Sequence, residues 1–144
     1  MKPTKHATTN YKRLKPFIDG LNGTDHRRYT ADGFMDLVVE RLYQDGAATV
    51  YSLTHYGEQN GDAMRDPDME LRVDPEAGTV EPLTWRNDYV GRFDQVYIYR
   101  NGQKLYSPRL RTSLDDFLWH WLQNIENQGF ARGISSPLQS ITPV

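Results

Sequence analysis

The chain has 144 residues, a formal net charge of −2 and no cysteine. This length predicts one domain rather than two. The lack of cysteine excludes a disulfide framework, a thiol nucleophile and cysteine-ligated metal centres. The first residues lead into no apolar segment, and no run of about 18 apolar residues occurs. The sequence therefore predicts a cytoplasmic protein with no membrane contact.

Charge is distributed unevenly along the chain. Residues 1–28 and 86–112 are basic, whereas residues 29–85 carry twelve acidic residues against three arginines. Two arrangements are open at this point. Folding either brings the segments together so that they neutralise one another, or leaves a basic surface for an anionic partner.

The N-terminal region predicts a tail followed by a helix. Residues 1–10 have no apolar periodicity, which predicts a flexible basic tail. Apolar residues then recur at helical spacing and predict a short helix over 11–21, with Asn10 as its N-cap. Pro16 lies inside this range and predicts a kink or a later start, because proline removes a backbone hydrogen bond.

Alternation of apolar and polar residues predicts the strands of the domain. They are expected at 34–43, 48–55, 69–73, 79–85, 95–100 and 104–106. Asp45-Gly46 and Asn101-Gly102 are typical of tight hairpin turns. The polar stretch 57–68 is expected to be a loop, and Pro82 predicts an edge strand or a bulge.

A second helix is the clearest predicted element. Ser113, with Asp116 three residues later, predicts its start, and Gly129 predicts its end. Between them, one apolar face is formed by Leu114, Phe117, Leu118, Trp121, Leu122 and Ile125. The fold class expected is α+β: an antiparallel sheet of about five or six strands in a meander, with N-terminal and C-terminal helices packed on one face. The single domain covers 11–130, and 131–144 is expected to be a loosely ordered tail.

Several short patterns together resemble a known family. They are Asn10-Tyr11-x-x-Leu14 before the first helix, Asp68-Met69-Glu70-Leu71-Arg72-Val73, and Phe117-Leu118-x-x-Trp121-Leu122 before Asn127-x-Gly129-Phe130. Over roughly residues 10–130 the chain resembles small bacterial domains of unknown function, some chromosomal and some encoded on plasmids or integrative elements. The resemblance implies a bacterial source and one compact domain, and it supplies no catalytic residues.

No arrangement of residues in the sequence predicts catalysis, a cofactor or a metal. Asp62, Asp66, Asp68 and Glu70 are oxygen ligands at short spacing, but they lack the order of a calcium-binding loop. His120 has Asp116 one helical turn before it, which orients an imidazole but supplies no nucleophile. The sequence therefore predicts a protein that is not an enzyme.

Aromatic and basic residues interleave between positions 85 and 111. The candidate surface consists of Arg86, Arg92, Tyr97, Tyr99, Arg100, Lys104, Arg109 and Arg111. On a strand, Tyr97 and Tyr99 share one face, so they either form a platform for stacked bases or belong to the core, with Val96 and Ile98 facing out. Small size, absence of catalytic motifs and abundant aromatic residues favour a protein-interaction or accessory module. The alternative is a nucleic-acid-binding module that uses this surface.

Overall fold

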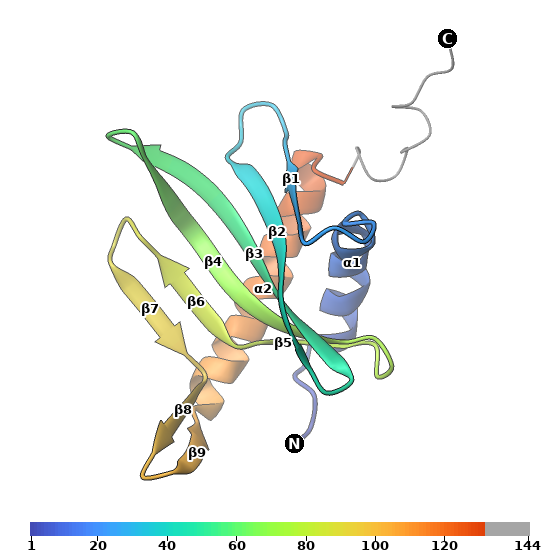
Figure 1. The fold of residues 1–144 in the computed structure, drawn as a ribbon, viewed down its shortest axis with the longest axis vertical. Helices are drawn as coiled ribbons and strands as arrows, with labels where there is room; N and C mark the ends of the chain where they lie inside the picture. The colour runs from blue at the N-terminus through green and yellow to red at the C-terminus, as the bar shows by residue number, and fades with distance from the viewer. Residues whose placement is uncertain (132–144) are drawn as a thin grey trace.

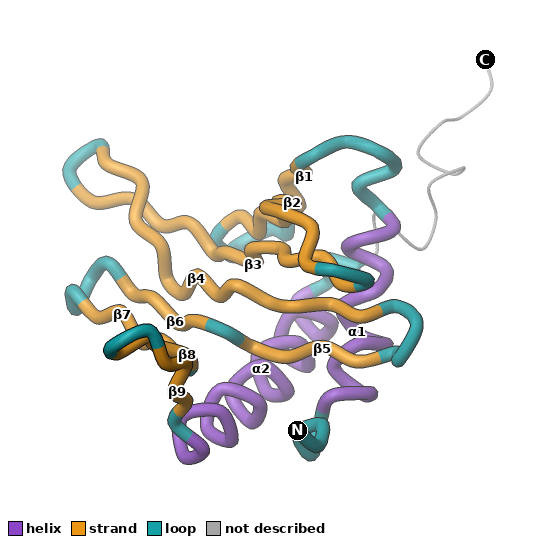
Figure 2. The backbone as a smooth tube through the Cα atoms, turned by 60° about the horizontal axis from the view of Figure 1, so that its bottom comes forward, coloured by secondary structure: helices purple, strands orange, loops and turns teal. Residues whose placement is uncertain are grey.

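Two helices cover one face of an antiparallel sheet in the computed structural model, which describes residues 1–131 (Figures 1 and 2). This arrangement confirms the predicted α+β class. The elements are α1 (Ala7–Asp19), β1 (His26–Tyr29), β2 (Asp36–Asp45), β3 (Ala48–Gln59), β4 (Asp62–Asp74), β5 (Thr79–Pro82), β6 (Thr84–Asn87), β7 (Arg92–Gln95), β8 (Tyr97–Arg100), β9 (Gln103–Tyr106) and α2 (Pro108–Gln128). The tail predicted over 131–144 lies outside the described residues, except for Ala131.

The main sheet has seven strands in the order β1-β2-β3-β4-β6-β7, and β5 pairs with β4 beside β6. All of these pairings are antiparallel. β8 and β9 form a separate two-stranded hairpin that extends beyond one end of the main sheet (Figure 1). This hairpin joins the sheet through backbone hydrogen bonds at Val96, whose amide donates to Leu83 and whose carbonyl accepts from Ser107.

The sheet is larger than the sequence predicts. β1 is an additional edge strand, His-Arg-Arg-Tyr, whose first three side chains are exposed and therefore show no apolar alternation. The loop predicted over 57–68 is wrong, because β3 and β4 continue as a long hairpin around Asn60 and Gly61. The strands predicted over 79–85 and 95–100 are each divided, at Leu83 and at Val96.

The first helix begins earlier than predicted, and its cap comes from a distant residue. α1 begins at Ala7, and its N-cap His6 makes no side-chain capping bond. Instead, the His6 backbone amide donates to a carboxylate oxygen of Asp115 on α2 (2.9 Å). The predicted cap, Asn10, is buried inside the helix, where its amide nitrogen donates to the Asp115 carbonyl (3.4 Å). The boundary predicted at residue 10 therefore lies within α1, which also continues through Pro16.

The second helix also begins before its predicted start at Ser113. Ser107 caps it by accepting a hydrogen bond from the Leu110 amide (3.2 Å), and Pro108 occupies the first turn, where proline is well tolerated. Gly129 ends the helix as predicted, with φ of 92°. Among residues 1–131, neither helix combines the length and the hydrophobicity required to span a membrane.

The core lies between the helices and the sheet. The apolar face predicted for α2 is buried apart from Phe117, which is partly exposed. The sheet contributes residues that alternate along its strands, namely Leu37, Val39, Leu53, Met69, Leu71, Val73 and Val80. Residues between these positions, such as Arg72 and Glu81, project from the opposite face of the sheet.

Ion pairs join the basic segments to the acidic middle segment. Arg28 pairs with Asp36, Asp88 pairs with Arg65, and Arg111 pairs with Glu81, each at 2.8 Å. The Arg28–Asp36 and Arg111–Glu81 pairs correspond to the first of the two charge arrangements, in which the basic and acidic segments neutralise one another, whereas in the third pair the basic segment supplies the carboxylate of Asp88.

Candidate functional site

The structure divides the eight candidate residues between different parts of the surface. The Arg86 guanidinium lies over the Phe93 ring (4.0 Å from its centroid). Arg92 forms an ion pair with Asp94 (2.9 Å). Arg92 and Arg109 line a small pocket beside the start of α2, and Arg100 is exposed at the end of β8. These four arginines therefore do not join the remaining candidates in one patch.

The other four candidates, Tyr97, Tyr99, Lys104 and Arg111, lie together. Tyr97 pairs with Tyr106 across the β8–β9 hairpin, and Tyr99 pairs with Lys104. Residues directly opposite in an antiparallel pair share a face, so one face of the hairpin carries three tyrosines and a lysine. Tyr97 is half-buried and Tyr99 is 72% exposed, whereas Val96 is buried. Tyr97 thus packs against the edge of the core and Tyr99 lies outside it, and the alternative in which Val96 and Ile98 face out does not hold for Val96.

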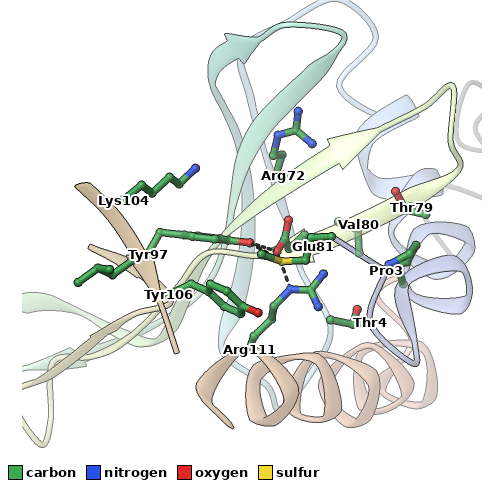
Figure 3. A pocket seen from close by; sticks show the side chains of 13 residues that line it. Pro3, Thr4, Arg72, Thr79, Val80, Glu81, Tyr97, Lys104, Tyr106 and Arg111 are labelled. Carbon is green, nitrogen blue, oxygen red and sulfur yellow. Dashed lines mark hydrogen bonds and ion pairs between the residues drawn. The ribbon is translucent and has the colours of Figure 1, made fainter. Parts of the chain in front are cut away.

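This face borders a groove made of two adjoining pockets, which we call the hairpin groove. Figure 3 shows the first of them. The first pocket has a volume of about 420 Å³ and the second about 630 Å³. Both are lined by Arg72, Glu81, Tyr97 and Lys104. The first is completed by Met1, Pro3, Thr4, Ala7, Thr79, Val80, Leu105, Tyr106 and Arg111. The second is completed by Tyr43, Asp45, Glu70, Leu83, Thr84, Gln95 and Tyr99.

Glu81 links three elements at the base of the first pocket. Its carboxylate accepts hydrogen bonds from the Tyr97 hydroxyl on the hairpin and from the Arg111 Nε on α2, the latter at 2.8 Å. Figure 3 shows both side chains directed toward Glu81. Burial, reinforced by the Glu81 carboxylate, raises the pKa of Tyr97 to about 12. The phenol therefore remains a hydrogen-bond donor at neutral pH and is not available as a base.

Two further cations lie at the groove. The Lys104 ammonium lies over the Tyr97 ring at 4.6 Å from its centroid, and among residues 1–131 no carboxylate forms an ion pair with it. Arg72 binds Asp45 through its Nε (2.8 Å). Its two terminal nitrogens make no hydrogen bond within the described part of the chain. In Figure 3 the charged ends of Arg72 and Lys104 lie on the other side of Tyr97 from Arg111.

The N-terminal segment forms one wall of the first pocket. The Thr4 hydroxyl donates to Asp115 at 2.6 Å, and the carbonyl of Lys2 accepts from Arg111 at 2.8 Å. Asp115 is only 1% exposed, and its two oxygens are used by Thr4 and by the His6 amide. The predicted flexible tail thus includes residues that contact α2 and complete the groove.

Three of the acidic residues considered in the sequence, Asp66, Asp68 and Asp116, have structural contacts. Asp66 accepts from Asn87 at 2.6 Å, and Asp68 accepts from Thr54. Asp116 contacts His6 at 3.1 Å, whereas His120 is exposed on α2. Within residues 1–131, the single group with metal-ligand spacing is His6, Asp115 and Asp116, whose ligand atoms lie within 4.8 Å of one another. Both Asp115 oxygens in this group already accept the hydrogen bonds of the N-terminal segment.

Sequence reasoning missed most of the other residues that line the groove, among them Tyr43, Arg72 and Glu81. Arg72 and Glu81 are register partners on β4 and β5. Their alternation with buried Leu71, Val73 and Val80 is visible in the sequence and was a usable signal for the outer face. Tyr43 follows a register shift between Arg41 and Tyr43 in β2, which no sequence pattern indicates.

Comparisons with known proteins show the family but no activity. Comparison with curated proteins and with solved structures gave no match. A family model described as "Domain of unknown function (DUF6908)" matches residues 9–131, which include all nine strands, α2 and all of α1 except its first two residues. The chain therefore belongs to this family of domains of unknown function.

Proposed function

We propose that this domain is a non-catalytic protein-interaction module that holds a segment of a partner protein in the hairpin groove. The observation that supports this proposal is the exposure of tyrosines that line the groove from two elements, β2 and the β8–β9 hairpin. Tyr99 is 72% exposed, Tyr43 50% and Tyr106 45%. Tyrosine combines a large apolar ring with a hydroxyl that bonds either to a partner or to water, and it is enriched among the residues that contribute most to protein interfaces.

The charges of the groove favour a polypeptide over a nucleic acid. The second pocket is lined by Asp45, Glu70 and Glu81 as well as by Arg72 and Lys104. A phosphate backbone carries one negative charge per nucleotide and would meet these carboxylates along its path. A polypeptide offers backbone donors and acceptors, apolar side chains and charges of either sign, which suit a mixed lining.

The aromatic platform expected for nucleic acid is also reduced in the folded chain. Stacking requires an open ring face, but Lys104 lies over the Tyr97 ring and the Tyr97 hydroxyl binds Glu81. Tyr99 is then the exposed ring of the pair. We therefore keep the nucleic-acid interpretation as an outcome of the test.

The test is selection from a random peptide library on the full chain, followed by affinity measurements for the peptides obtained. We expect Tyr43→Ala and Tyr99→Ala each to weaken binding by about tenfold or more, since truncation of a central aromatic residue commonly costs about 2 kcal/mol. Val90→Ala is the matched control, because Val90 is equally exposed (69%) but lies outside the groove. Its affinity should equal that of the wild type.

Two results would refute the proposal. One is a selection that enriches no peptide, and the other is a set of peptides whose affinity is insensitive to Tyr43 and Tyr99. Single-stranded oligonucleotides are titrated in parallel at low salt. Binding that is abolished by Tyr99→Ala and weakens steeply with salt would support the nucleic-acid alternative instead.

A further inference from the structure

The two pockets of the hairpin groove differ in charge. The first is lined by Arg72, Lys104 and Arg111 against one carboxylate, Glu81. The second is lined by Arg72 and Lys104 against the carboxylates of Asp45, Glu70 and Glu81. Because the two pockets share Arg72, Lys104 and Glu81, they differ in Arg111, which lines the first pocket, and in Asp45 and Glu70, which line the second.

The cations of the first pocket are not equally satisfied. Arg111 is neutralised by Glu81 and also donates to the carbonyl of Lys2. Arg72 pairs with Asp45 through one nitrogen and retains its two terminal nitrogens for a further acceptor. Lys104 contacts the Tyr97 ring and has no carboxylate partner within residues 1–131. Lys104 is therefore the cation of the first pocket that no carboxylate pairs with among residues 1–131.

We infer that the first pocket of the hairpin groove binds a carboxylate of the partner segment between Lys104 and Arg72. This inference rests on the proposed function and assigns it a ligand chemistry. A carboxylate carries a single negative charge, which balances Lys104, and its two oxygens can accept from an ammonium and a guanidinium together. A phosphate dianion would add excess negative charge beside Glu81 and Asp45.

The position of Tyr97 supports the same site. Its ring lies under the Lys104 ammonium, and its hydroxyl is held by Glu81, so the ring that the ammonium contacts is fixed in place. The carboxylate comes either from an aspartate or glutamate side chain or from a free chain end, and these two sources share the recognition chemistry.

The experiment selects peptides on the full wild-type chain from two libraries, one with free C-termini and one with blocked C-termini. We expect a fixed Asp or Glu in the enriched sequences if the carboxylate is a side chain, and enrichment confined to the free-end library if it is a chain end. Lys104→Gln should weaken binding of these peptides by about tenfold, and Lys104→Arg should retain most of it. Lys12→Gln removes an equal charge from exposed α1 and should have no effect.

A charge-reversal variant makes the test specific. Selection on Lys104→Glu should replace the fixed acidic residue with Lys or Arg, because opposite charges are required across the contact. Lys104 is exposed, so its variants should unfold at nearly the wild-type temperature. Peptides that depend on Tyr43 and Tyr99 but contain no required carboxylate would overturn this inference and leave the proposed function intact. A failure to enrich any peptide would overturn both.

Discussion

The buried carboxylate of Asp115 provides the most direct test of how α1 is held. Asp115 accepts from the Thr4 hydroxyl at 2.6 Å and from the His6 amide at 2.9 Å, and it is 1% exposed. It therefore caps α1 from another helix and places a negative charge near the positive end of the α1 dipole. We predict that Asp115→Ala destabilises the protein by about 2 kcal/mol.

The magnitude follows from opposing contributions. Two hydrogen bonds to an ionised acceptor contribute about 1.5–3 kcal/mol each, and the helix-dipole interaction adds about 0.3–1 kcal/mol. Removing the carboxylate also removes the cost of burying a charge, which is several kcal/mol. The expected net loss of stability is comparable with the loss measured when an N-cap residue is replaced, about 0.5–2 kcal/mol. It lies at the upper end of that range because two donors are left without a partner.

Thermal and urea unfolding of paired variants measure this effect. Asp116→Ala is the matched control, since the Asp116 carboxylate is adjacent in sequence, is 54% exposed and, among residues 1–131, contacts only the His6 ring. It should change stability by less than about 0.5 kcal/mol. A double-mutant cycle between Thr4→Val and Asp115→Ala should give a coupling energy of about 1 kcal/mol. Equal stability of the Asp115 and Asp116 variants would refute the capping role.

Three other predictions concern the core and its titrating groups. Trp121→Ala should cost about 3–5 kcal/mol in chemical denaturation, because Trp121 is buried in the face that α2 packs on the sheet, whereas Trp119→Ala should cost much less. Stability should fall as pH rises from about 10 to about 12, since the Tyr97 pKa is about 12 in the folded protein and about 10 in the unfolded chain. In an absorbance titration of Tyr97→Phe, the phenol that ionises at the highest pH in the wild type should be missing. Burial lowers the His55 pKa, so NMR should show this imidazole titrating below about 6.5. Stability should decline as pH falls below that value, because the unfolded chain then takes up a proton that the folded protein does not.

Elements with a strong local pattern could be predicted from the sequence. The apolar positions of α2 repeat over three turns, and the structure buries nearly all of them. The Asp45-Gly46 and Asn101-Gly102 turns also lie where predicted, because positive φ is required there and few residues adopt it. In both cases the information lies within a few adjacent residues.

Elements that depend on distant contacts could not be predicted in this way. α1 begins at Ala7 because Asp115, more than a hundred residues away, accepts a hydrogen bond from the backbone amide of the N-cap residue, His6. β1 exists because β2 offers it a full set of register partners, although its own side chains are mostly exposed. The extension of β3 and β4 over 57–68 likewise depends on their mutual pairing rather than on hydrophobic alternation.

The hairpin groove illustrates the same limit for a binding site. Alternation along β8 places Tyr97 and Tyr99 on one face, and this much follows from the sequence. The partners of that face follow from the tertiary fold, because β5 brings Glu81 between Tyr97 and Arg111. When the position of Glu81 is not known, the interleaved aromatic and basic residues indicate a uniformly cationic surface suited to nucleic acid.

With Glu81 in place, the balance of charge in the groove changes. Glu81 neutralises Arg111 and fixes the Tyr97 hydroxyl, and Asp45 partly neutralises Arg72. Lys104 is then the one cation at the groove that no carboxylate pairs with among residues 1–131. This unpaired lysine beside exposed tyrosines suits the ligand that we propose, which has one anionic group and an apolar neighbour, better than a polyanion. Because this preference depends on Glu81, the effect of Glu81 on binding separates the protein-interaction interpretation from the nucleic-acid interpretation.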